Sequence, residues 1–227
     1  MAAGKPAKAP RRSWGVLFIR NVLLWLVPVA LLWTLLTPFY NRFLLGSAEN
    51  LAQWTESPNV TNLLRRDTHF AYIARRDFPP SKSLVHSFRV TDVHFHLVML
   101  GTLFLAVPRI TWRRRLESLG WAFLITIFFD ILLIFFYVKA TYATQLGAWS
   151  LAHYGSFAQN FWGLGKHLLD LPFKFSLPFV LWAGFYVREL MSEILPKIKP
   201  ADLNRRPADL NRRPADPNRR PAARPPR

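Results

Sequence analysis

Asp130 is the most distinctive chemical group of this sequence, because it is an acidic residue placed deep within a long apolar run. A carboxylate costs free energy in an apolar interior, so it needs a protein partner, a water-filled space or a bound proton. Lys139 follows nine residues later, about 13 Å along a helix, too far for a direct pair within one helix. The partner must come from elsewhere in the chain or from another protein. The candidates in the chain are His94, His96, Asn21 and Arg20. We favour a packing or assembly role for Asp130 over a proton or ion pathway and over catalysis.

His94 and His96 follow Asp92 at a spacing that resembles a metal site. On a strand, positions i and i+2 share a face. On a helix they point about 200° apart and do not easily share an ion. The two histidines lie at a predicted strand-to-helix junction, so their spacing does not show whether they could bind one metal ion. Ordinary buried or interfacial histidines are the commoner case, so we treat His94, His96 and Lys139 as weak candidates.

The usual signatures of catalysis are absent from the sequence. It contains no cysteine, which excludes thiol nucleophiles, disulfides and thiolate metal sites. It also lacks the HExxH and GxSxG motifs and a phosphate-binding glycine loop. We therefore expect no catalytic residue, no metal and no cofactor.

The segments that must position these residues are apolar runs. The chain has 227 residues, of which 51% are hydrophobic, yet its formal net charge is +17. Both values follow if long apolar runs alternate with short basic segments. About 20 apolar residues cross a bilayer as a helix. The predicted membrane helices are 14–38, 94–110, 119–143 and 173–190.

The basic segments indicate the orientation of these helices. Lysine and arginine are concentrated at residues 1–13, between residues 109 and 118, and in the tail 191–227. Short basic flanks stay in the cytoplasm, which predicts both termini inside and the loops 39–93 and 144–172 outside. The loop 39–93 carries seven basic and five acidic residues, but a loop this long contributes weakly to the rule. The first run exceeds the 7–15 residues typical of a signal peptide, so we favour an uncleaved anchor.

The two outer loops have their own patterns. In the loop 39–93, Phe43 to Trp54 is compatible with a helix, and Thr68–Ala74 and Leu84–Val90 flank Pro79 and Pro80. Phe70 and Tyr72 alternate with smaller or polar neighbours, which predicts a β-hairpin. The loop 144–172 mixes aromatic residues with glycine and favours an amphipathic linker or an interfacial helix.

The carboxyl-terminal tail is a tandem repeat. Residues 200–206 recur at 207–213 and, with one change, at 214–220. A proline in every repeat forbids a continuous helix, so we expect disorder. Ten basic and three acidic residues follow from Lys197 onward, which favours contact with anionic lipid at the inner leaflet. A repeat without function is an equal alternative, and nothing indicates a nucleic-acid partner. The fold class is thus an all-α integral membrane protein with about four transmembrane helices, a small external hairpin and a disordered tail.

The order of these features resembles the small exosortase H-associated membrane proteins of Gram-negative bacteria. The resemblance covers roughly residues 15–190. It rests on Leu23–Pro28 with Pro38-Phe39-Tyr40, Ala106-Val107-Pro108, Val138-Lys139-Ala140 with Gln145-Leu146-Gly147, and Leu177–Trp182. His94-Phe95-His96 and the repeat tail depart from the family pattern. Exosortases need a cysteine, so the chain is not an exosortase, and the resemblance implies an accessory role.

Three functions remain open from the sequence. The first is a non-enzymatic accessory protein of the bacterial inner membrane, in an exosortase-type sorting system, whose partner is an exosortase or its substrate. The second is a transporter or channel subunit with Asp130 in a polar path. The third is a membrane enzyme acting on lipid or polysaccharide through His94, His96 or Asp130.

Overall fold

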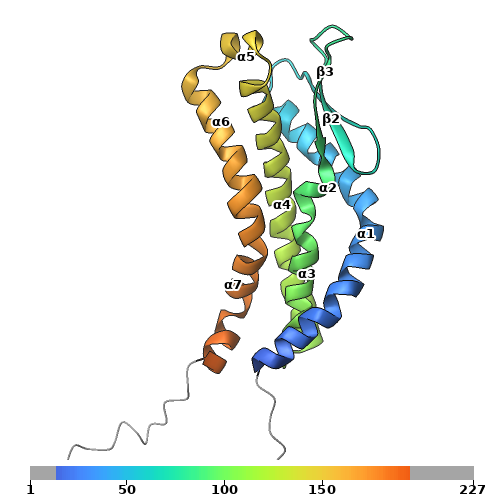
Figure 1. Ribbon diagram of the computed structural model, residues 1–227, viewed down its shortest axis with the longest axis vertical. Helices are drawn as coiled ribbons and strands as arrows, with labels where there is room; N and C mark the ends of the chain where they lie inside the picture. Colours follow the sequence, from blue (N-terminus) through green and yellow to red (C-terminus); the bar gives the residue numbers. More distant parts are fainter. Residues whose placement is uncertain (1–13, 195–227) are drawn as a thin grey trace, which may run out of the picture. The chain divides into compact units, whose positions relative to one another are not determined.

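The structure, a computed structural model, describes residues 14–194 (Figure 1); the predicted cytoplasmic segment 1–13 and the repeat tail lie outside the described residues. The chain divides into two units, Met1–Val187 and Arg188–Arg227, and the architecture below is that of the first. The helices are α1 (Trp14–Trp54), α2 (Val90–His94), α3 (His96–Ala106), α4 (Trp112–Thr144), α5 (Ala148–His153), α6 (Ser156–Leu168), η1 (Leu169–Phe173) and α7 (Lys174–Ile194). The strands are β1 (Thr61–Arg65), β2 (Phe70–Arg75) and β3 (Leu84–Arg89).

Among the described residues, three helices are long and apolar enough to cross a membrane. They are α1, α4 and the continuous helical segment Ser156–Glu189. A shorter apolar segment, Val90–Ala106, comprises α2 and α3. In Figure 1 these helices run side by side, and the strands lie beyond the upper end of α2. The structure is therefore mostly helical with a small sheet, as the sequence predicts at this coarse level.

Helix α1 is longer than the predicted segment 14–38. Both Pro28 and Pro38 lie inside it, and it continues to Trp54. The helix-compatible stretch after Phe43 is thus part of the same helix. Its second half buries Tyr40, Leu44, Ala48 and Ala52, which share one face at a spacing of four residues. This stripe packs against the rest of the protein and extends the helix past the predicted end.

The second predicted segment, 94–110, is replaced by α2 and α3, which meet at Phe95. Helix α3 ends at Ala106, and Val107 takes an extended ψ of 118°. Pro108 explains this end, because the residue before proline avoids the helical conformation. Helix α4 then begins at Trp112, so most of the predicted loop 111–118 is the first part of that helix.

The predicted outer loop 144–172 is mainly helical. Helix α6 begins at Ser156 and continues through η1, which contains Pro172, into α7. The predicted membrane helix 173–190 is therefore the last part of a longer helical segment. A π-helical turn accommodates the proline, which cannot donate its amide to the helix. The chain continues in one direction where the sequence indicated a break.

Gly165 allows α6 to pack closely on α4. A Cβ at this position would lie 2.4 Å from Cε1 of Phe136. Phe136 in turn contacts the rings of Phe161 and Trp162. The aromatic residues of the predicted linker thus pack against α4, which explains why this segment folds as a long helix.

The β-sheet has three antiparallel strands in the order β1-β2-β3, and the predicted hairpin is its β2–β3 part. The two faces of β2 are unequally buried. Ala71 and Ile73 are fully buried, whereas Phe70 is 40% exposed. The face of β2 that carries Ala71 and Ile73 therefore belongs to the core.

Candidate functional site

Asp130 is fully buried on α4. The hydroxyl of Tyr40 on α1 donates a hydrogen bond of 2.8 Å to its Oδ2. His96 Nε2 on α3 lies 3.5 Å from Asp130 Oδ1. One carboxyl group thus lies between three helices and is hydrogen-bonded to one of them, α1. His96, one of the partners that the sequence offered, lies nearby, but neither its Nε2 nor Asp130 Oδ1 has a hydrogen bond among the described residues.

His94 lies in a separate hydrogen-bonded chain. Trp33 Nε1 donates to His94 Nδ1 at 3.2 Å, so the ring proton is on Nε2. His94 Nε2 then donates to Asn41 Oδ1 at 2.6 Å. Asn41 Nδ2 donates to the carbonyl of Thr68 at 2.7 Å. Both nitrogens of His94 are occupied, and the chain fixes α1 to α2 and to the turn before β2.

The resemblance of Asp92, His94 and His96 to a metal site does not extend to three dimensions. His94 and His96 contact different partners, and Asp92 is exposed beside Arg89. Within the part of the chain that the structure describes, no three His, Asp or Glu side chains are grouped to hold an ion. His94 is thus hydrogen-bonded through both ring nitrogens, whereas His96 is buried beside Asp130 with neither ring nitrogen hydrogen-bonded among the described residues.

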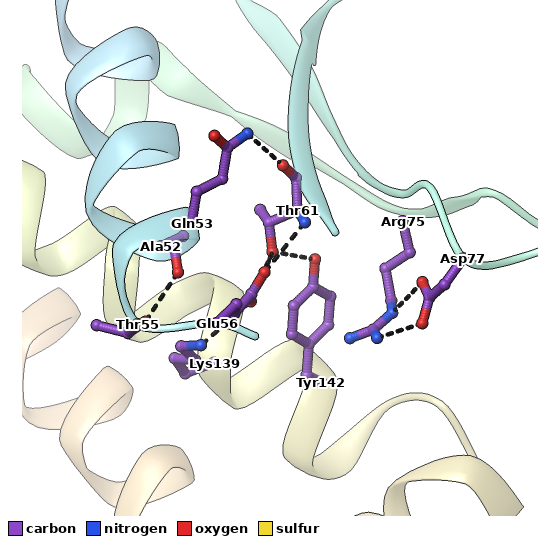
Figure 2. A network of polar contacts seen from close by, with 9 residues as sticks. All are labelled: Ala52, Gln53, Thr55, Glu56, Thr61, Arg75, Asp77, Lys139 and Tyr142. Atoms are coloured by element: carbon purple, nitrogen blue, oxygen red, sulfur yellow. Dashed lines mark hydrogen bonds and ion pairs between the residues drawn. The ribbon is translucent and has the colours of Figure 1, made fainter. Parts of the chain in front are cut away.

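Lys139 does not approach Asp130 but pairs with Glu56. Its Nζ lies 3.1 Å from Glu56 Oε1, and both side chains are about 10% exposed. The same carboxylate accepts hydrogen bonds from the backbone N–H and the hydroxyl of Thr61. That hydroxyl also lies 2.9 Å from the hydroxyl of Tyr142. Figure 2 shows these groups meeting between the end of α1, the start of β1 and the last part of α4.

Arg75 is the second buried cation of this region. It forms a bidentate pair with Asp77, and the hydrogen bond from the guanidinium lowers the pKa of that carboxyl below its ordinary value. The guanidinium carbon lies 4.3 Å from the ring centre of Trp149 and 4.7 Å from that of Tyr142. Such contacts between a cation and an aromatic ring are favourable. They fix α5 to β2 and to α4.

These two ion pairs line one cavity of about 390 Å³, which we call the end pocket. Its lining consists of Thr55, Glu56, Ser57, Pro58, Val60, Arg75, Asp77, Lys139, Trp149, His153 and Tyr154. The charged residues of the lining are paired with each other, so the pocket is polar without an excess of either sign. Such a surface suits an uncharged polar or aromatic segment of a ligand, because an isolated charge would lack a counterion there.

The sequence pointed to only one residue of the end pocket, Lys139. Glu56, Arg75 and Asp77 are ordinary loop residues in the sequence, and Trp149 was assigned to an interfacial linker. Two features of the sequence could have indicated the site. The loop 39–93 carries acidic residues among its basic ones, and Lys139, at the end of an apolar run, requires a counterion. Another pair, Lys174 with Asp170 at the start of α7, was likewise missed.

Comparison with known proteins adds no further identification: no family model matches the chain, and neither a curated protein nor a solved structure does.

Proposed function

We propose that this protein is a non-enzymatic accessory protein of the bacterial inner membrane, acting in an exosortase-type system for sorting envelope proteins. The three long apolar helices support a membrane location, with Val90–Ala106 as a fourth, short crossing. That segment has 17 residues, the lower limit for a crossing helix. The resemblance described above supports the sorting system. The buried polar groups support a non-catalytic role, because Asp130, His94 and Lys139 are all engaged in contacts that join elements of the chain.

The single observation that carries the proposal is the position of the end pocket. Lys139 and Arg113 are 26 residues apart on α4, about 39 Å along a helix. This exceeds the roughly 30 Å of the hydrocarbon core. If the arginines at the start of α4 lie at the cytoplasmic surface, the end pocket lies outside the membrane on the far side. A polar pocket there is available to an outer segment of a partner protein.

The membrane arrangement is tested with reporter fusions along the full chain. Fusions at Ser57 and Ser156 are expected to report the periplasm, and fusions at Ser118 and Lys199 the cytoplasm, because the arginines of α4 hold its first turn inside. Paired alkaline phosphatase and green fluorescent protein activities give the readout. A cytoplasmic signal at Ser57 contradicts the arrangement.

The role of the end pocket is tested by co-purification of the full chain with a co-expressed exosortase after mild detergent extraction. Ser57 is exposed and lines the pocket, so Ser57→Trp places a large side chain in the opening without removing a described contact. We expect recovery of the exosortase to fall about tenfold, the effect of losing roughly 1.4 kcal/mol of binding free energy. Ser81→Trp is the matched control, because Ser81 is exposed on the loop between β2 and β3.

Three outcomes of this experiment contradict the proposal. The first is that the wild-type chain recovers no exosortase. The second is that Ser57→Trp recovers as much as the wild type. The third is that Ser81→Trp reduces recovery equally. Apparent melting temperatures of the purified variants show whether a loss reflects the pocket or the fold.

A further inference from the structure

An apolar groove lies at the opposite end of the helices from the end pocket. Its cavity is about 310 Å³, with walls from α1, α3 and α4. Each helix contributes four residues, and among the lining side chains only Trp33 carries a polar atom, its indole nitrogen, which is hydrogen-bonded to His94. The groove therefore suits a hydrocarbon chain, because it offers an incoming polar group no free partner.

The groove exists because α1 and α3 pack closely together, whereas α4 leaves space beside them at Gly120. Helices α1 and α3 touch where Gly101 meets Val29, since a Cβ on Gly101 would lie 3.0 Å from Val29 Cγ1. Asn21 Nδ2 also donates to the carbonyl of Ala106. On α4 the wall contains Gly120, where a Cβ would meet no atom within 4 Å. Space remains in front of this glycine, and it opens at Leu32 and Leu116, which are 57% and 47% exposed.

One face of α4 connects the groove to a positive charge. Leu116, Gly120 and Phe123 line the groove, and Arg113 precedes Leu116 by three residues. Positions at spacings of three and four lie on the same helix face. Arg113 is exposed, so its guanidinium stands about one turn from the mouth of the groove. Arg114 and Arg115 belong to the same first turn of α4, and Arg109 lies in the connection just before it. Arg115 donates to the carbonyl of Leu105 at the end of α3.

An aromatic pair marks the same level of the protein. The rings of Trp25 on α1 and Trp112 on α4 lie 5.6 Å apart. Tryptophan is enriched where a membrane protein passes from hydrocarbon to headgroups. Below this pair lie arginines, which bind phosphate through paired N–H donors, and above it lies the apolar groove.

We propose that this groove binds one anionic phospholipid, with an acyl chain along Gly120 and the phosphate at Arg113. The charge of the arginine turn complements the headgroup, and the apolar walls complement the chain. The inference rests on the membrane location proposed above but not on the exosortase partner. The site is separate from the lipid contact expected of the repeat tail, because its residues lie in α1, α3 and α4.

Native mass spectrometry of the full chain in detergent tests this proposal, with phosphatidylglycerol and phosphatidylcholine of the same acyl chains as probes. The wild type is expected to retain one phosphatidylglycerol in preference to phosphatidylcholine. Gly120→Leu fills the groove and is expected to weaken retention of both lipids about tenfold. Arg113→Gln is expected to reduce the preference for phosphatidylglycerol about fivefold, the worth of one basic residue near an anionic headgroup, and to leave retention of phosphatidylcholine unchanged.

Gly184→Leu is the matched control, because Gly184 on α7 also has no atom within 4 Å of an added Cβ and does not line the groove. Leu32→Trp, a second substitution at the mouth, is expected to act as Gly120→Leu does if the latter folds poorly. Equal retention of the two lipids by the wild type overturns the proposal. So does unchanged retention in both groove variants, or an equal loss in Gly184→Leu. Reporter fusions that place α4 outside the membrane overturn the membrane location as well, whereas a failure in mass spectrometry alone leaves it intact.

Discussion

Asp130→Leu is expected to lower the apparent melting temperature of the detergent-solubilised protein by on the order of 10 °C, whereas Asp130→Asn is expected to retain most of it. Leucine leaves the buried Tyr40 hydroxyl without its acceptor and removes the carboxyl oxygen that lies nearest to His96 Nε2. Each buried polar group left unpaired costs about 1–3 kcal/mol, and each kcal/mol is worth roughly 2–4 °C in a chain of this size. Asparagine keeps an oxygen that accepts from Tyr40 and adds an N–H that His96 can accept.

The comparison of the two variants separates assembly from proton chemistry. Phe128→Leu is the control on the same helix, since Phe128 is 66% exposed and makes no contribution to this cluster; its melting temperature is expected to stay close to that of the wild type. If Asp130→Asn abolishes function while expression and melting temperature remain normal, the titratable proton matters. The transporter or enzyme interpretation would then replace the accessory role.

Lys139→Met is expected to destabilise the protein at the end pocket by about 3–5 kcal/mol, the cost of breaking a buried ion pair by removing one partner. Glu56 would remain largely buried with hydrogen bonds from Thr61 but without its counterion. The measurement is thermal unfolding in detergent, read by light scattering and intrinsic fluorescence. Lys82→Met, which removes an exposed lysine from the loop between β2 and β3, is expected to change the melting temperature little.

A double-mutant cycle identifies the cause of the loss. Glu56→Gln removes the charge but keeps groups able to bond with Thr61, so the double variant with Lys139→Met is expected to be more stable than Lys139→Met alone. Additive losses from the two substitutions would show that the pair contributes no coupling energy. The buried ion pair would then be incidental to the position of β1.

The sequence by itself determined the apolar segments and the residue that most needed a partner. Apolar runs of membrane-crossing length are a local property, so α1 and α4 were predicted at their correct places although their ends were not. Asp130 was recognised for the same reason, because a carboxyl group within such a run is visible without any knowledge of contacts. The alternation in β2 and β3 located two strands but not the face of β2 that turns inward.

Other local patterns were too weak or pointed the wrong way. Strand β1 is short, and Leu63 and Leu64 are adjacent, so it shows no clear alternation. The segment 144–172 was predicted as an outer loop, yet packing on α4 keeps the helix continuous from Ser156 through a π-helical turn. In both cases contacts with distant residues outweighed the local preference. Sequence patterns do not report such contacts.

Only the tertiary structure decided which polar and charged side chains pair with each other. Lys139 pairs with Glu56, 83 positions away, and Asp130 with Tyr40, 90 positions away. The cost of burying an unpaired charge says that a partner must exist, but the partner's identity depends on how the helices pack. The end pocket and the apolar groove arise in the same way. Each is formed by side chains from three or more elements, and no single segment of the sequence carries its pattern.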